Sequence, residues 1–345
     1  MPDWLGTAVL AVLASVMPGK MAMAAMMTLV SAGLLAGLYS CAAGLSDAKW
    51  SRQQRSQVLL ILTPLAICEF LTLGFWGFLI SSALCFHVMG KLLRGGTRAD
   101  LNRQVRIAVM LALAYWAHPL PVMLSGVFQG YLFVIEQWQA SGGQITSWKD
   151  TLTKFAEAVW PWLLPSGLCV WFAVRLISLE VAPIGVPSMT VFRNRLLDLV
   201  HMNGLLDMSP TPTSGGVFVL LLGVLSAGAA LTRGRLYPPA KSISTFTLIL
   251  VVAYVLVPDT VGSGSSIAIR ILFNLVAFVT LLALSPGGME AGHLALCSLL
   301  AAVCVLSFGG EYLLVSKRLG PALGRCGSGG RWRYSGIRVA GSASV

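Results

Sequence analysis

Residues 107–126 read IAVMLALAYWAHPLPVMLSG, and the interpretation of the fold depends on this stretch. An apolar run is interrupted by His118, prolines follow at positions 119 and 121, and apolar sequence then resumes. A proline has no backbone N–H, and its ring clashes with the preceding turn of a helix. We therefore predict that the apolar run 107–137 forms two short or tilted helices that meet at the prolines. A single kinked span is the alternative.

The composition indicates what surrounds these helices. Of the 345 residues, 56% are hydrophobic and 11% are charged, whereas soluble domains carry about 25% charged residues. We therefore predict an all-α fold, a polytopic transmembrane helix bundle with about eight to ten membrane segments of roughly 20 residues each. The apolar runs are residues 4–17, 21–45, 57–89, 107–137, 157–178, 215–232, 243–258, 271–286 and 293–316.

The run 57–89 is too long for one straight span. Gly74 and Gly77 lie within it, in the sequence LTLGFWGFL. Glycine adopts backbone conformations that other residues avoid, and it lets two helix backbones approach closely. We therefore expect a break or a close helix contact at these two positions.

The domain organisation follows from two departures from the apolar pattern. Residues 1–319 are predicted to form one transmembrane helical domain, and residues 320–345 a disordered basic tail rich in Gly, Ser and Arg. The long connection 179–214 is predicted to be external or interfacial. Within it, residues 191–208 place apolar side chains at helical spacing, which is typical of an amphipathic helix at the membrane interface.

The net charge of +11 has a topological explanation. Lys and Arg gather in the cytoplasmic loops of membrane proteins, which places the basic loops 90–106 and 233–241 in the cytoplasm. Counting spans outward from them puts the histidine-proline motif, the 179–214 connection and residues 257–270 on the external side. No nucleic-acid-binding module is visible, so nucleic acid is not predicted as a partner, whereas membrane lipid is.

Ionisable groups at membrane depth are costly, so each is a functional hypothesis. His118 either ends a helix in a structural role or contacts a substrate or phosphate. Glu69 suits a helix cap or a structural partner. Six of the seven cysteines lie in apolar runs at no metal-ligand spacing. No metal site and no cofactor are predicted, although a divalent metal is not excluded.

The segment VPDTVGSGSSIAIRILFN, residues 257–274, is the second candidate region. Backbone N–H groups at a helix start favour phosphate, and an arginine can hold it with two parallel hydrogen bonds. The alternative is a plain loop whose arginine pairs with the nearby aspartate or extends to the lipid headgroups. The candidate phosphate-binding residues are Gly262, Gly264, Arg270 and Asn274, and the candidate catalytic residues are Asp259 and His118.

Three motifs together resemble a known architecture. GFWGFLISSALCF, YWAHPLPVMLSG and YVLVPDTVGSGSSIAIRILF are similar to segments of bacterial polytopic proteins with the GT-C glycosyltransferase architecture. The resemblance covers roughly residues 15–290 and implies a protein of the bacterial inner membrane. It further implies that a sugar is transferred from a polyprenyl-phosphate-linked donor at the external membrane face.

The chain departs from that architecture at its start. Such proteins carry an acidic residue in the first external loop, and Asp3 and Asp47 are poor counterparts of it. An inactive relative, or one that lacks its first spans, is therefore also predicted.

Two further classes of function stay open. A transporter or permease would use the broken helices at 57–89 and 107–137 to form a site near the membrane midplane. A non-catalytic membrane scaffold would need no such site. A shared site for His118 and Arg270 at one membrane surface favours the transferase, and broken segments that meet in a pseudo-symmetric core favour the transporter.

Overall fold

The computed structural model describes residues 4–45, 50–72, 74–95, 100–140, 148–178, 193, 195, 238–257, 267–284 and 293–306. Those up to residue 305 belong to one compact unit. Most of the 179–214 connection, the loop that contains Asp259, Gly262 and Gly264, and the tail 320–345 lie outside the described residues. The predicted domain boundary at 319/320 therefore stays a prediction.

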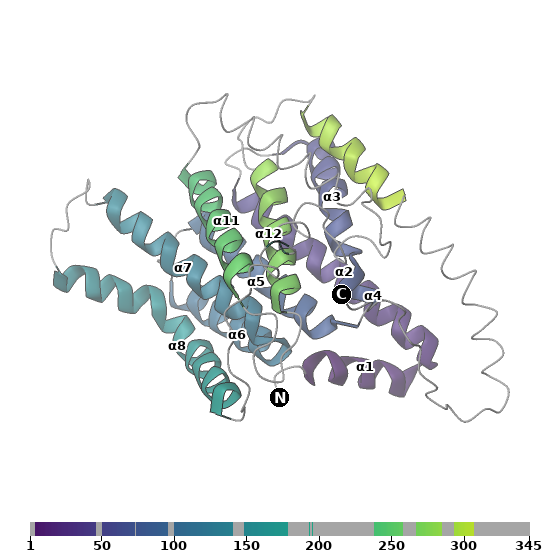
Figure 1. Ribbon diagram of the computed structural model, residues 1–345, viewed down its shortest axis with the longest axis horizontal. Helices are drawn as coiled ribbons and strands as arrows, with labels where there is room; N and C mark the ends of the chain where they lie inside the picture. The colour runs from purple at the N-terminus through teal and green to yellow at the C-terminus, as the bar shows by residue number, and fades with distance from the viewer. Residues whose placement is uncertain are drawn as a thin grey trace. The chain divides into compact units, whose positions relative to one another are not determined.

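Every element in these ranges is a helix, which confirms the all-α prediction for the described part of the chain (Figure 1). Helix α2, helix α5 and the first 19 residues of α7 are long and apolar enough to cross a membrane, as a helical membrane bundle requires. The labelled helices are α1 (Trp4–Val16), α2 (Gly19–Gly44), α3 (Arg52–Ala66), α4 (Glu69–Thr72), α5 (Trp76–Gly95), α6 (Leu101–Ala117), α7 (Pro119–Ala140), α8 (Trp148–Ser178), α11 (Pro238–Leu256) and α12 (Ile267–Ala283). A further helix spans His293–Leu306.

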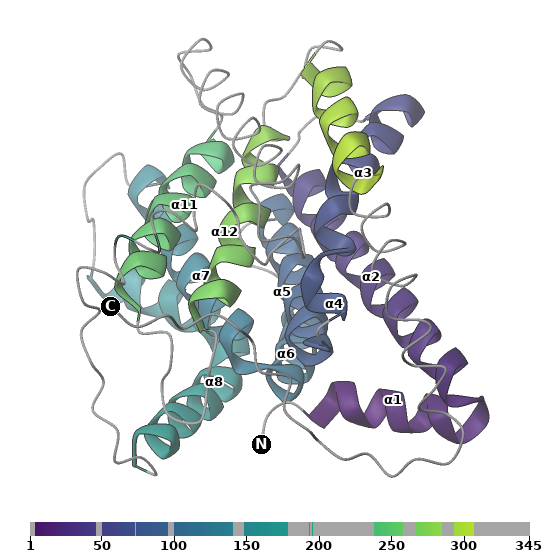
Figure 2. The same ribbon diagram turned by 45° about the vertical axis from the view of Figure 1, so that its right-hand side comes forward.

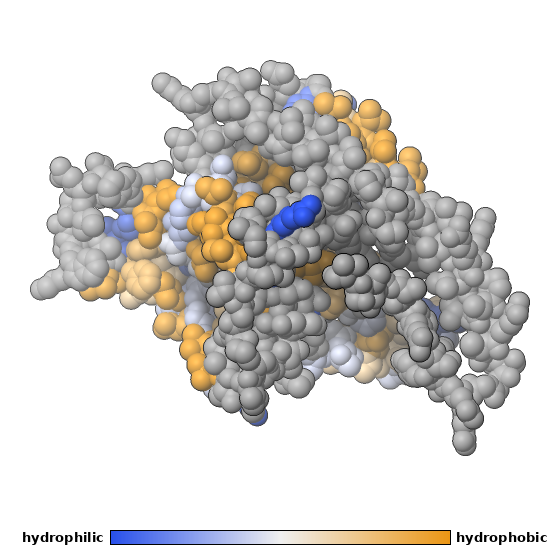
Figure 3. Space-filling model, viewed as in Figure 1, coloured by the Kyte–Doolittle hydropathy of each residue, from blue (hydrophilic) through white to orange (hydrophobic). Residues whose placement is uncertain are grey.

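Helix α5 lies at the centre of the bundle. It packs against α1, α2, α4, α6 and α7, while α11 and α12 lie side by side and contact α7 and α2 respectively (Figure 2). Large apolar side chains remain exposed on the outer faces of α6, α8 and α11, and Figure 3 shows the apolar surface that the described residues form on one side. Lipid contact would explain such faces, since soluble monomers rarely expose large apolar patches.

Helices α2 and α5 are in backbone contact along a line of small residues. A Cβ atom added at Gly44 would lie 2.6 Å from the carbonyl oxygen of Gly90. One added at Gly37 would overlap the backbone of Ala83, and one added at Gly90 would overlap that of Ser40. In lipid, no hydrophobic effect drives two helices together. Close packing at small residues supplies much of the attraction between them instead.

Polar side chains join α8 to α6 and α7. The amide of Gln129 in α7 donates to the carbonyl of Ala158 in α8 at 2.7 Å. The hydroxyl of Tyr115 in α6 donates to the carbonyl of Leu168 at 3.1 Å. Both bonds satisfy buried polar groups and fix the register of α8 along its two neighbours.

The apolar run 57–89 is broken into three helices, α3, α4 and α5. Gly74 supplies the turn between α4 and α5, because its φ of +80° lies in the left-handed region that favours glycine. The N–H of Phe75 then donates to the carbonyl of Phe70 at 3.0 Å. Gly77 has the other expected role, since its backbone nitrogen lies 3.1 Å from a Cβ added at Gly6 of α1.

The run 107–137 also forms two helices, as predicted. Helix α6 ends at Ala117, His118 is extended (φ −167°, ψ 131°), and α7 begins at Pro119. A residue before proline is driven toward this extended region. Both prolines lie in the first turn of α7, where backbone N–H groups have no partner within the helix. The prolines therefore separate two helices without removing a hydrogen bond from either.

Candidate functional site: the His118–Arg270 junction

The structure brings His118 and Arg270 together. One guanidinium nitrogen (Nη1) of Arg270 lies 2.8 Å from Nε2 of the His118 imidazole. Arg270 lies in the first turn of α12, whereas His118 links α6 to α7, so the contact joins three helices. His118 is buried, with 8% of its surface exposed, and Arg270 is half-buried. The contact therefore lies at the edge of the bundle's interior.

Phenyl rings form the wall behind this pair. The Cζ atom of Arg270 lies 5.0 Å from the ring centroid of Phe75 and 5.9 Å from that of Phe78. The His118 ring meets Phe78 edge-on at 5.6 Å. A guanidinium over aromatic faces is stabilised by their quadrupoles, more strongly where water is excluded. The sequence analysis did not assign either phenylalanine a role in the site, although both lie in the GFWGF motif that it quoted.

The Gly74 turn places both phenyl rings. It ends α4 and starts α5 in a new direction, with Phe75 at the turn and Phe78 in the first turn of α5. One turn further along α5, the hydroxyl of Ser81 donates to the His118 carbonyl at 2.7 Å. The break in one apolar run is thereby bonded to the break in the other.

The contacts of the imidazole indicate its protonation. An arginine side chain only donates hydrogen bonds, so Nε2 of His118 must accept, and the ring is therefore neutral. Its other nitrogen, Nδ1, faces the backbone N–H of Leu120 at 3.2 Å. A neutral imidazole has one accepting nitrogen and one N–H. The two donors therefore face a ring that can accept only one of them.

Asn274, a candidate phosphate-binding residue, makes a local hydrogen bond. Its side chain is buried, and its amide nitrogen donates to the Arg270 carbonyl at 2.9 Å. Asparagine in a helix commonly competes with the backbone in this way. The bond holds the backbone turn that carries the guanidinium, so Asn274 supports Arg270 in the position described.

The other candidate residues are not placed by the structure. Asp259, Gly262 and Gly264 precede α12 and lie outside the described residues. Within the described ranges, no group of three or more His, Cys, Asp or Glu side chains could hold a metal ion. The site that the structure does describe consists of one guanidinium, one imidazole and a wall of phenyl rings.

Comparisons with protein-family models, curated proteins and solved structures found no match to this chain. The resemblance to GT-C proteins therefore stays a prediction. What the fold supports is a class: the apolar helices suggest an all-helical membrane protein. Any finer function has to be argued from the contacts at the His118–Arg270 junction.

Proposed function

We propose that this chain is a multi-pass inner-membrane protein of GT-C-like type that transfers a sugar from a polyprenyl-phosphate-linked donor at the external face. The His118–Arg270 junction would bind the phosphate of that donor. The observation that carries the proposal is the 2.8 Å contact between two side chains that are 152 positions apart. The junction brings a permanent cation and a polar ring to one point of a largely apolar bundle.

The surroundings of Arg270 favour an anion. Charge attraction grows as water is excluded, and the rings of Phe75 and Phe78 cover one side of the guanidinium. Guanidinium groups also match phosphate geometry with two parallel hydrogen bonds. Arg270 is half-buried, so part of the residue remains accessible.

A phosphate would also resolve the conflict at the imidazole. With a phosphate oxygen between the two side chains, Arg270 and an Nε2–H of His118 both donate to that oxygen. The lone pair of Nδ1 is then kept for the N–H of Leu120, which already faces it at 3.2 Å. The two donors that face the ring, from Arg270 and from the backbone of Leu120, thereby each have an acceptor, and the ring changes its tautomer once.

The proposed reaction is a displacement at the sugar. An acceptor hydroxyl attacks the anomeric carbon, the bond from that carbon to the phosphate oxygen breaks, and the hydroxyl proton passes to a base. Arg270 stabilises the negative charge that develops on the departing polyprenyl phosphate, and His118 orients it. Asp259 is the proposed base, although it lies outside the described residues.

The test compares membranes that contain the wild-type chain with membranes that contain Arg270→Ala, each supplied with radiolabelled polyprenyl-phosphate sugars. Loss of one charge-stabilising group is expected to lower turnover about 100-fold or more. Arg175→Ala is the matched control, because Arg175 is an exposed arginine of α8 that stacks on Trp171. Equal turnover by the wild type and Arg270→Ala would overturn the proposed site, and no turnover by the wild type would overturn the reaction.

One observation favours transport as a second candidate. The two breaks, at Gly74 and at His118, pack against each other through the Phe78–His118 ring contact and the Ser81 bond. Broken helices that meet are typical of transporter sites. Flux of a labelled sugar phosphate into vesicles, without transfer to any acceptor, would support this candidate. If Arg270→Ala left this flux unchanged, the junction would not be part of the transport site.

A further inference from the structure

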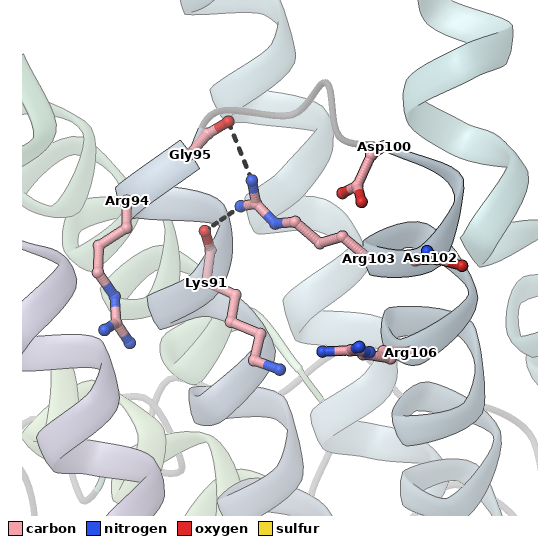
Figure 4. A pocket seen from close by; sticks show the side chains of 7 residues that line it. All are labelled: Lys91, Arg94, Gly95, Asp100, Asn102, Arg103 and Arg106. Atoms are coloured by element: carbon pink, nitrogen blue, oxygen red, sulfur yellow. Dashed lines mark hydrogen bonds between the residues drawn. The ribbon is translucent and has the colours of Figure 1, made fainter.

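A second group of basic side chains lies between the end of α5 and the start of α6. It lines an open cavity of about 520 Å³, shown in Figure 4. Four basic side chains and one carboxylate, that of Asp100, contribute to its wall. The basic residues are Lys91, Arg94, Arg103 and Arg106. The sequence analysis interpreted this segment only as a cytoplasmic loop signal, so the cavity is an additional feature.

Two of the four basic side chains have structural bonds. Arg94 donates to the hydroxyl of Ser40 in α2 at 2.8 Å. Arg103 donates to the carbonyl of Gly95 at 3.2 Å and to that of Lys91. Basic side chains commonly satisfy the last carbonyls of a helix in this manner. Arg94 and Arg103 therefore hold the ends of α5 and α6 in place around the cavity.

The other two, Lys91 and Arg106, have a different arrangement. Their charged ends point toward each other across the cavity, and no hydrogen bond links either side chain to the other residues drawn in Figure 4. Two positive charges that face each other repel. An anion between them would turn that repulsion into two attractions.

An apolar surface begins at the mouth of the cavity. Leu101, Val105 and Val109 are spaced four residues apart on α6 and are 69%, 45% and 54% exposed. Exposed Leu113 and Trp116 continue this stripe along the same helix. Residues at this spacing share one helix face. A soluble anion would gain nothing from that face, whereas the acyl chains of a lipid would lie along it.

We infer that the α5–α6 cavity binds the phosphate group of an anionic phospholipid, with Lys91 and Arg106 on either side of the headgroup and the acyl chains along α6. Basic pockets between helices on the cytoplasmic side of a membrane are suited to such headgroups. The positive-inside rule assigns this end of α5 to the cytoplasm. The site is separate from the His118–Arg270 junction and does not rest on the function proposed for it.

The test uses the purified full chain in nanodiscs of phosphatidylcholine, titrated with a fluorescent phosphatidylglycerol. The double variant Lys91→Gln, Arg106→Gln removes both facing charges. Each basic residue near a membrane surface contributes about fivefold in affinity for anionic lipid, so the double variant is expected to bind about 25-fold more weakly. The control is Lys20→Gln, Arg52→Gln, which removes the same two residue types from exposed positions elsewhere.

The outcomes separate the lipid from other anions. Equal affinity for phosphatidylglycerol in the wild type and the double variant would overturn the inference, as would an equal loss in the control. Displacement of the lipid by inorganic phosphate at equal concentration would show a site for soluble phosphate, which overturns the lipid assignment. Thermal unfolding in phosphatidylcholine alone checks that the double variant is folded. The lipid affinity of the single variant Arg106→Gln, at an exposed position, is measured in parallel.

Discussion

Arg270 and Arg106 carry the same charged group in opposite surroundings. Arg270 lies against two phenyl rings and a buried imidazole, whereas Arg106 is exposed at the mouth of an open cavity. Water and salt screen a charge at an exposed position, and they screen one beside an aromatic wall far less. Removal of the first arginine should therefore weaken the fold, whereas removal of the second should cost the fold little.

The largest effect on stability is expected from the phenyl rings beside the junction. Phe78 is 1% exposed and contacts Phe70, Phe273, His118 and Arg270. Phe78→Ala removes a buried ring that contacts all four of these residues. We therefore expect a loss of about 3–5 kcal/mol in the free energy of unfolding. Denaturation in mixed micelles measures it.

Phe155→Ala is the control for that experiment, because Phe155 is 44% exposed and should cost far less. Equal losses for the two variants would mean that the wall does not support the junction.

The next largest effect tests the bound arginine. Arg270→Gln removes the cation–π contacts and shortens the side chain that donates to the imidazole. We expect unfolding to be easier by about 2–3 kcal/mol, from one partly desolvated cation–π contact and one charged hydrogen bond. The loss should change little with salt, because two phenyl rings and a buried imidazole cover part of the guanidinium. A strongly salt-dependent loss would place Arg270 in the same class as Arg106.

A smaller effect isolates the turn that positions the phenyl rings. Gly74 has a φ of +80°, and among the described residues, its chain neighbours aside, no heavy atom lies within 4 Å of an added Cβ. Gly74→Ala therefore introduces backbone strain without a steric clash, and we expect a cost of about 1–2 kcal/mol. Thermal unfolding measures this cost in stability. An unchanged midpoint would show that the turn relaxes to another conformation.

The smallest effect is expected at the exposed arginine. Arg106→Gln should change the free energy of unfolding by less than about 0.5 kcal/mol, as exposed substitutions commonly do. The measurement is the same micelle denaturation, carried out in zwitterionic detergent so that no anionic lipid occupies the cavity. A loss as large as that of Arg270→Gln would contradict the comparison between the two arginines.

The sequence and the structure agree most closely at the helix breaks. The prolines after His118 and the glycine at position 74 act through their own backbone, so their effect can be deduced without knowing any neighbour. The rarity of charge in an apolar chain marked His118 and Arg270 as candidates, and the transferase hypothesis placed them in one site. The phenyl rings could not be predicted in this way, because only the Gly74 turn and the rotation of α5 select Phe75 and Phe78 from the other aromatic residues of the chain.

Asn274 illustrates the limit of spacing arguments. Its position one turn beyond Arg270 correctly places it on the same helix face, which suggested a shared ligand. In the structure the amide nitrogen donates to the Arg270 carbonyl, and the shared ligand stays a prediction. Spacing along a helix specifies which residues are neighbours, but it does not specify which of several acceptors a neighbouring amide will use.

The apolar, all-helical character of the described chain, its two breaks and its few intramembrane charged groups could be predicted from the amino-acid sequence alone. These features follow from the composition and from the backbone chemistry of proline and glycine, which act locally. The contact of His118 with Arg270 beside Phe75 and Phe78, and the position of Lys91 opposite Arg106 across a cavity, became visible in the folded chain. Such contacts depend on how helices pack and rotate against one another, and packing sums many weak interactions from residues far apart in the chain.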